Sequence, residues 1–409
     1  MSTTPSLRPM FTFSGWIIEK IDFDWETLQA FVNLRIDGRK QHFKCSQCGS
    51  PMGTMRTSER VVQDLPIGVL STHLLFTAFQ GRCAHCKTIE TVTLPGLSPN
   101  AQATERLKTH VSHLCRYMPC DKIPEFINIS GGTARRWDKE VLMKTLPSPT
   151  LDDLRALLID EKSIGKGHNY LTVVLNADTG ETLFLGEGKK KETLDQFLSS
   201  LTEEQKASIQ CVGIDRGGSY QASVKEHLPN VAIVYDKFHI IANYNTVIDQ
   251  IRRREWRLAD EANKKFIKGQ RFNLFRNPEN LTPKRESALK ELLAMNEDLS
   301  QAYILKDMLK QLWTYTYEAC ASKFLDNWIL LAKETGIAEL KKFAKGLDRA
   351  REGLLSYCRH RITSAKIEAF NGTIKREAFN GTIKRIVYKA CGYNDLDYLY
   401  LKIRQEAAK

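Results

Sequence analysis

The sequence contains no apolar run of the ~20 residues that a membrane-spanning helix needs. Its opening letters, MSTTPSLRPMFTFSGW, also lack the charged start and apolar core of a signal peptide. Together these absences predict a cytosolic protein without a membrane partner. In that reducing compartment the ten cysteines are not expected to form disulfides, so their spacing needs another explanation.

The sequence has fewer acidic than basic residues. The 48 Asp and Glu residues are outnumbered by 60 Lys and Arg, which leaves a formal net charge of +12. This balance is common among proteins that act on nucleic acid, although a solvated basic surface would also produce it. Apolar residues make up 42% of the 409 positions, which is enough for a sizeable core, and the length allows about two to four domains.

Four of the cysteines form two Cys-x-x-Cys pairs, Cys45 with Cys48 and Cys83 with Cys86. Two such turns supply the four thiolates of a structural Zn²⁺ site. The letters between the pairs alternate in hydropathy like two strands joined at PIG, which suits a zinc ribbon over residues 1–98. A redox pair is the alternative, but neither pair opens a helix in a βαβ unit. The other six cysteines are scattered and are interpreted as core or incidental residues.

From residue 101 the apolar periodicity becomes helical. A short helix near 123–128, a turn at 129–132 and a second helix from Thr133 fit a helix-turn-helix, although many helical hairpins share this pattern. Its position after a zinc ribbon in a basic chain favours a DNA-binding region over residues 99–148. The candidate DNA contacts are Thr133, Arg135, Arg136 and Lys139.

Residues 152–242 predict an α/β domain with a mixed sheet. Its first strand is RALLIDEKSI, and the turn NADTG joins the next two as an antiparallel hairpin. Two further strands, which end in Asp215 and Asp236, follow amphipathic helical stretches. The order β-β-β-α-β-α-β is that of an RNase H-like sheet, in which the first and fourth strands are neighbours.

In such a sheet, Asp160 at the end of the first strand and Asp215 at the end of the fourth lie side by side. Two carboxylates at that separation repel each other unless a cation lies between them, so the pair predicts a divalent-metal site for Mg²⁺ or Mn²⁺. An aspartate after a buried strand is often only a cap or a turn, which is the alternative for Asp215. Asp236 is expected to hold His239 or a basic residue next to the metal ligands.

Residues 243–360 show no strand pattern and predict a basic helical insertion into this domain. Its tryptophans, Trp256, Trp313 and Trp328, occur at helical spacing and are interpreted as core residues. Its excess cations are expected to bind phosphates without sequence preference. The candidates that begin this stretch are Arg252, Arg253 and Arg254.

The final segment, residues 361–409, opens a new helix and repeats itself. The nine letters EAFNGTIKR occur at Glu368–Arg376 and again at Glu377–Arg385. In a helix, nine residues rotate the chain by roughly 900° and advance it by ~13 Å, so both glutamates cannot reach one metal site. Glu368 is favoured as the ligand, because a polar turn and the preceding helix tie it to the core, and Glu377 is the alternative.

With these residues in place, the chain resembles bacterial insertion-sequence transposases of the DDE class, and closely the family called ISL3. The resemblance spans nearly the whole chain and lies in VVQDLPI, GRCAHC, IDEKSIGKGHNYLTVVLNADTG, GIDRGGSYQASVKEHLPNVAIVYDKFHI and RITSAKIEAFNGTIKR…ACGY. It implies a zinc-binding N-terminus, recognition of terminal repeats, and an RNase H-like catalytic domain interrupted by helices. The acidic triad of the family falls on Asp160, Asp215 and Glu368, with Glu377 as the alternative.

The expected function is therefore metal-dependent nicking of double-stranded DNA at element ends and strand transfer into target DNA. A homo-oligomer that holds two ends is expected, at the nucleoid in the bacterial cytoplasm. The doubled glutamate predicts an impaired enzyme. Two alternatives remain at this point: a catalytically inactive remnant that only binds DNA, and an RNase H-like nuclease that does not join strands.

Overall fold

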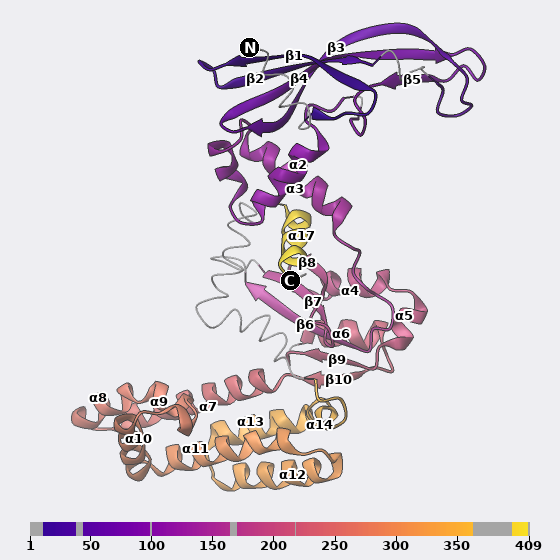
Figure 1. Cartoon of the computed structure of the whole chain (residues 1–409). Helices are drawn as coiled ribbons and strands as arrows, with labels where there is room; N and C mark the ends of the chain where they lie inside the picture. The colour runs from indigo at the N-terminus through magenta and orange to yellow at the C-terminus, as the bar shows by residue number, and fades with distance from the viewer. Residues whose placement is uncertain are drawn as a thin grey trace. The chain divides into compact units, whose positions relative to one another are not determined.

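The computed structural model describes residues 11–37, 44–98, 100–163, 170–216, 218–362 and 395–407 (Figure 1). The chain divides into two units. The first comprises residues 1–147 and 385–405, and the second comprises residues 148–384 and 406–409. Among the described helices, none has the length and apolar character needed to cross a membrane.

A five-stranded sheet forms much of the first unit. Its strands are β1 (Trp16–Asp24), β2 (Gln29–Ile36), β3 (Met52–Ile67), β4 (Leu70–Cys83) and β5 (Ile89–Val92). β3 and β4 form the long antiparallel hairpin that the alternating sequence predicts. The order is β1-β2-β4-β3, with β2 parallel to β4 and β5 paired to β4. The first two strands were not predicted from the sequence.

Three helical segments follow this sheet: α2 (Glu105–Cys115), the 3₁₀ helix η2 (Cys120–Glu125) and α3 (Gly131–Thr145). The short helix expected near 123–128 is therefore a 3₁₀ turn that begins earlier, directly after Pro119. α3 also begins two residues before the predicted start at Thr133, because the hydroxyl of Ser130 caps it and accepts the Thr133 amide at 3.1 Å.

The buried carboxylate of Asp64 fixes α2 to the sheet. It accepts a hydrogen bond from Thr104, the N-cap of α2, at 2.6 Å, and it forms an ion pair with Arg106. The backbone amide of Thr104 also donates to the carbonyl of Gln63 on β3, at 3.0 Å. Because the buried charge is paired and hydrogen-bonded, it orients the helix instead of destabilising the core.

The last helix, α17 (Leu396–Ala407), belongs almost entirely to the first unit. Its side chains Tyr398, Leu399 and Lys402 are fully buried, and two of them bond to residues of α2 and α3. The N-terminal unit therefore contains residues from both ends of the chain, which no periodicity in the sequence indicated.

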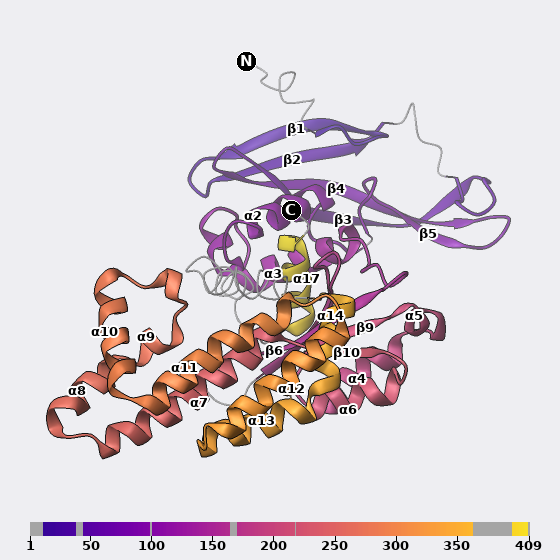
Figure 2. The ribbon, with the colours of Figure 1, turned by 90° about the horizontal axis from the view of Figure 1, so that it is seen from below.

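A second five-stranded sheet, in the order β10-β9-β6-β7-β8, lies in the second unit (Figure 2). β6 (Ala156–Ser163), β7 (Tyr170–Asn176) and β8 (Thr182–Glu187) are antiparallel neighbours, whereas β6, β9 (Cys211–Ile214) and β10 (Ala232–Tyr235) run parallel. These are the pairings that the strand order predicts. β6 continues past Asp160, its expected end. The helices between the strands are α4 (Lys191–Ser200), α5 (Glu203–Ser208) and α6 (Gly218–His227).

The predicted helical insertion follows β10. Its α-helices are α7 (Lys237–Leu258), α8 (Glu261–Gly269), α9 (Arg271–Phe275), α10 (Pro283–Met295), α11 (Glu297–Lys310), α12 (Glu318–Glu334), α13 (Ala338–Arg349) and α14 (Arg351–His360). Trp313 and Trp328 are core residues, as predicted. The same prediction was wrong for Trp256, whose exposed fraction is 36% because it lies near the solvent-facing end of α7.

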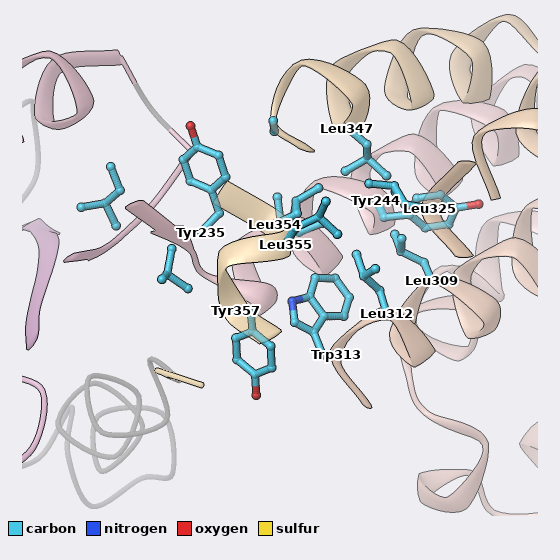
Figure 3. Packing of buried hydrophobic residues seen from close by; sticks show 14 of the residues in the cluster. Tyr235, Tyr244, Leu309, Leu312, Trp313, Leu325, Leu347, Leu354, Leu355 and Tyr357 are labelled. Carbon is cyan, nitrogen blue, oxygen red and sulfur yellow. The ribbon is translucent and has the colours of Figure 1, made fainter. Parts of the chain in front are cut away.

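One continuous hydrophobic core joins this insertion to the sheet. Figure 3 shows Leu354 and Leu355 of α14 between Tyr235 of β10 and the leucines of the helical bundle. Burial of such side chains contributes roughly 1.5–3 kcal/mol each, so α14 anchors the insertion firmly to the sheet edge. The insertion therefore cannot be regarded as an independent domain on a loose linker.

Candidate functional site

Asp160 and Asp215 occupy matching positions on neighbouring parallel strands. β6 and β9 pair through Leu157–Val212 and Leu158–Gly213. Asp160 follows Leu158 by two residues, and Asp215 follows Gly213 by two residues. Residues two apart on a strand share a face, and neighbouring strands are ~4.8 Å apart. The register therefore directs both carboxylates to one face of the sheet, at the edge formed by the carboxyl ends of these two strands.

His239 brings an imidazole to this edge. It lies in the first turn of α7, whose N-cap is Asp236; the carboxylate of Asp236 accepts the Phe238 amide at 3.0 Å. Nδ1 of His239 lies 2.9 Å from Oδ2 of Asp215, and Nε2 lies 3.6 Å from Oδ2 of Asp236. Asp236 thus caps the helix and faces His239, while His239 itself reaches Asp215.

The histidine and the aspartate shift each other's pKa. The hydrogen bond to Asp215 raises the pKa of His239 to about 9, although burial opposes the shift. Burial raises the pKa of Asp215, but hydrogen bonds from His239 and from the Arg216 amide hold it below its ordinary value. While Asp215 is ionised, the raised pKa of His239 means that the pair's contribution to stability is fully present below about pH 6.5 and is lost as the pH rises through about 9; in acid it is lost again when Asp215 is protonated. At neutral pH an imidazolium therefore lies beside the carboxylates.

Two polar residues near this edge were not found from the sequence. Tyr220, on α6, shares a 2.8 Å hydrogen bond with the hydroxyl of Thr172 on β7. Burial raises the pKa of Tyr220 to about 12, and the negative charges of Glu161 and Asp160 add to this shift, which places the phenol near them. A tyrosine in an amphipathic helix gives no sequence signal of such a position.

The chain returns to this edge after the helical insertion. Ile362, which follows α14, lies 3.6 Å from the point that a Cβ on Gly213 would occupy, so it contacts β9 two residues before Asp215. Glu368 and Glu377, the candidate third carboxylates, lie outside the described residues.

The four cysteines of the first unit form two matching turns. In each turn the amide of the fifth residue donates to the carbonyl of the first cysteine: Gly49 to Cys45 at 2.9 Å and Lys87 to Cys83 at 3.1 Å. Both fifth residues have left-handed backbone conformations, with φ of 68° for Gly49 and 61° for Lys87. The two pairs therefore present their thiols in the same local geometry.

The four sulfurs converge. All lie within 4.8 Å of one another, with 3.3 Å between Cys45 and Cys86 and 3.5 Å between Cys48 and Cys83. Zinc–sulfur bonds of ~2.3 Å in a tetrahedron place sulfurs roughly 3.8 Å apart, so this cluster fits the ion. Hydrogen bonds from Thr88 lower the pKa of Cys86 to about 6, which favours the thiolate that a metal binds.

The predicted DNA contacts on α3 differ in exposure. Arg136 is exposed, whereas Arg135 is half-buried, and the hydroxyl of Thr133 bonds to Ser130. Lys139 forms ion pairs with Asp395 at 2.8 Å and Asp397 at 3.6 Å, at the start of α17. Of the predicted contacts on α3, Arg136 is the most exposed cation.

A buried polar cluster joins α17 to α2 and α3. Asp138 of α3, which is 0% exposed, accepts hydrogen bonds from Tyr398 at 2.5 Å and from Lys402 at 3.0 Å. Lys402 also donates to the carbonyl of Cys115 at 2.9 Å, and the thiol of Cys120 lies 3.1 Å from the Tyr398 hydroxyl. Cys115 and Cys120 were interpreted as core residues and are buried. The ion pair between Lys402 and Asp138 beside them was not predicted.

The three arginines near the end of α7 make internal ion pairs. Arg252 is buried against Asp249 at 2.8 Å, and Arg254 pairs with Glu339 at 2.9 Å and with Asp298. Arg253 also reaches Asp249, but 61% of its side chain is exposed. Of the three, Arg253 is the best candidate for a phosphate contact.

Comparison with known proteins gives consistent matches. A family model described as "Transposase", of the DDE type named ISL3, matches residues 157–403. The transposase for insertion sequence element IS1001 of Bordetella parapertussis is 33% identical over 402 residues, which cover 96% of this chain and 95% of that protein. The transposase for insertion sequence element IS1557 of Mycobacterium tuberculosis (strain CDC 1551 / Oshkosh) is 28% identical over 246 residues, 54% of this chain and 55% of that protein.

Proposed function

Because this chain belongs to the ISL3 family of insertion-sequence transposases, we propose that Asp160 and Asp215, with a glutamate of the repeat, hold the divalent cations for DNA nicking and strand transfer. The pairing of β6 with β9, which sets the two aspartates at one edge, carries this proposal. The sheet order, with three antiparallel strands beside two parallel ones, supports an RNase H-like fold for the second unit.

The oxygen ligands at this edge suit Mg²⁺ or Mn²⁺. When two such ions are bound, they activate a water or a 3′-hydroxyl and stabilise the leaving oxygen. Asp160 and Asp215 contribute ligand oxygens from fixed strand positions. His239 orients Asp215 through its Nδ1 hydrogen bond, and Asp236 fixes the first turn of α7 that carries His239. Glu368 completes the set in this proposal.

The activity is tested with the purified chain and duplex DNA that carries the element ends. With Mg²⁺ we expect nicks at the ends followed by joined products, and both disappear with a chelator. Nicks without joined products would favour a nuclease of the same fold. Terminal-repeat binding without nicks at any divalent metal would favour the DNA-binding remnant and would refute the catalytic proposal for this copy.

The two-glutamate question has a test of its own. Excision of either copy of EAFNGTIKR yields the same chain, so the deletion shows whether the repeat is harmful but not which glutamate binds metal. We expect the deletion to raise strand transfer at least about tenfold, since misplacement of a catalytic group by 1 Å can cost 10²-fold. Equal or lower activity after the deletion would contradict an impairment by the repeat.

Point variants in the full chain assign the ligand. On the proposal that Glu368 is the ligand, Glu368→Gln should abolish the residual nicking. Glu377→Gln is the matched control and should leave nicking unchanged. The opposite pattern would assign the ligand to Glu377.

For the first unit we propose a structural Zn²⁺ held by Cys45, Cys48, Cys83 and Cys86. Purified chain should contain one zinc, and Cys83→Ser should remove it, because three thiolates bind zinc much more weakly than four. Loss of the ion should unfold the β3–β4 tip and lower terminal-repeat binding, as metal binding and folding are coupled. Cys320→Ser, at an exposed free thiol, is the control. A full complement of zinc in Cys83→Ser would exclude this site.

Recognition of terminal repeats is proposed for α2, η2 and α3, arranged as a helix-turn-helix. Exposed Arg136 on α3 supports this role, and the ion pairs between Lys139 and the start of α17 support a fixed orientation of α3. In this arrangement α17 positions the recognition helix. A homo-oligomer is proposed because transposition requires two element ends to be held together.

A further inference from the structure

Dense positive charge lies around the turn that joins α7 to α8 and α9. Residues 252–276 contain nine Lys and Arg but only three Asp and Glu, so their net charge of +6 is half of the +12 carried by the whole chain. Five exposed residues of α8, α9 and the position after them define what we call the basic tip: Lys265, Lys268, Arg271, Phe272 and Arg276.

Ion pairs compensate the arginines of α7 but not all of this charge. Arg254 pairs with Asp298 and Glu339, and Asp249 is shared by Arg252, Arg253 and Arg271. Among the described residues, no ion pair involves Lys265 or Lys268. Phe272 has 65% of its surface exposed, with the Arg271 guanidinium 5.7 Å from its ring. An exposed ring among cations is unfavourable in water but matches nucleic acid, which offers apolar sugar and base surfaces beside phosphates.

α7 sets the distance between this tip and the carboxylates. Its first turn carries His239, beside Asp215, and Figures 1 and 2 both show it leading away from the sheet to α8 and α9. Arg271 of the basic tip lies 3.4 Å from Asp249, ten residues after His239, which is a rise of about 15 Å along the helix. The far end of α7 is about 33 Å from its start, so the tip flanks the distal half of the helix.

We propose that the basic tip binds the phosphate backbone of the DNA duplex engaged at the carboxylates, about five to ten base pairs from the scissile phosphate. The contact is electrostatic and independent of sequence, and Phe272 adds an apolar contact in the groove. This inference rests on the proposed position of the catalytic site for its distance. The existence of a duplex contact at the tip does not depend on that position.

Charge-removal variants test the contact. A triple variant with Lys265→Ala, Lys268→Ala and Arg276→Ala should weaken duplex binding at least about tenfold and reduce the slope of log K against log salt by about 2 to 3, equally for terminal-repeat and unrelated sequences. The matched control, Lys341→Ala with Lys342→Ala and Lys345→Ala, removes three exposed charges from α13 and should change neither quantity. The proposal would be overturned if both triple variants changed duplex affinity equally, or if the variant of the basic tip did not change it.

A photo-crosslinking residue in place of Phe272 tests the distance in an otherwise intact chain. Crosslinks should map about five base pairs from the cleavage position at the element end, and duplexes trimmed to fewer than about three base pairs on that side should abolish both the crosslink and the effect of the triple variant. Crosslinks at other distances would refute the alignment along α7. Because these readouts require no cleavage, they fail separately from the nicking assay.

Discussion

Asp215→Asn should slow Mg²⁺-dependent nicking by at least about a thousandfold while terminal-repeat binding stays unchanged. Asparagine keeps the shape and can still accept the hydrogen bond from His239, but it lacks the charge that holds a divalent cation. Because 42% of the Asp215 side chain is exposed, the substitution should not disturb the core. The measurement is single-turnover nicking of DNA that carries the element ends.

A second readout identifies the cause of the loss. Removal of the Asp215 charge should bring the pKa of His239 down from about 9 towards its ordinary value, which NMR titration can follow. Asp236→Asn is the control, since asparagine caps α7 as well as aspartate does and Asp236 touches His239 only at 3.6 Å. That variant should lose about tenfold to a hundredfold. Nicking by Asp215→Asn within about tenfold of the wild-type rate would exclude Asp215 as a metal ligand.

Lys402→Met should destabilise the first unit by about 3–5 kcal/mol, because it leaves the carboxylate of Asp138 buried without its cation. Both side chains are almost completely buried, at 1% and 0% exposure. Hydrogen exchange in α2 and α3 should become about 10²- to 10³-fold faster, and terminal-repeat binding should fall with it. The exchange measurement reports this unit alone, which is necessary in a chain of two units.

Two further variants separate charge from packing. Lys402→Met combined with Asp138→Asn should recover most of the lost stability, because it removes the buried charge. The amide oxygen can still accept a hydrogen bond from one of the two hydroxyls, Tyr398 or Ser112, and the amide NH2 can donate to the other. Lys139→Met breaks a half-exposed pair with Asp395 and should cost less than about 1 kcal/mol. If Lys402→Met and Lys139→Met have equal effects, the buried pair does not hold α17 in place.

The sequence predicted those parts of the fold that depend on local periodicity. The β3–β4 hairpin alternates apolar and polar residues, and the β7–β8 hairpin turns at NADTG, so both were found. Strand order then allowed Asp160 and Asp215 to be placed on neighbouring strands, because connection rules limit the possible sheets. Helix starts were less accurate, since a Ser130 cap and Pro119 set them locally.

Contacts between distant parts of the chain were not predictable in the same way. The hydrogen bond from Tyr398 to Asp138 joins residues 260 positions apart, and the pair of Tyr220 with Thr172 depends on how α6 lies on the sheet. Neither α17 nor α6 differs in composition from an ordinary amphipathic helix. The side chains that complete a site can therefore be known only once the elements are packed.

The placement of α17 affects the order of events during synthesis. About 250 residues separate the end of α3 from the start of α17, and at 5–20 residues per second a ribosome needs roughly 13–50 s to add them. Until then the nascent N-terminal unit lacks the partner of Asp138 and the ion pairs of Lys139. The first unit can therefore reach its complete packing only when synthesis of the polypeptide is nearly finished.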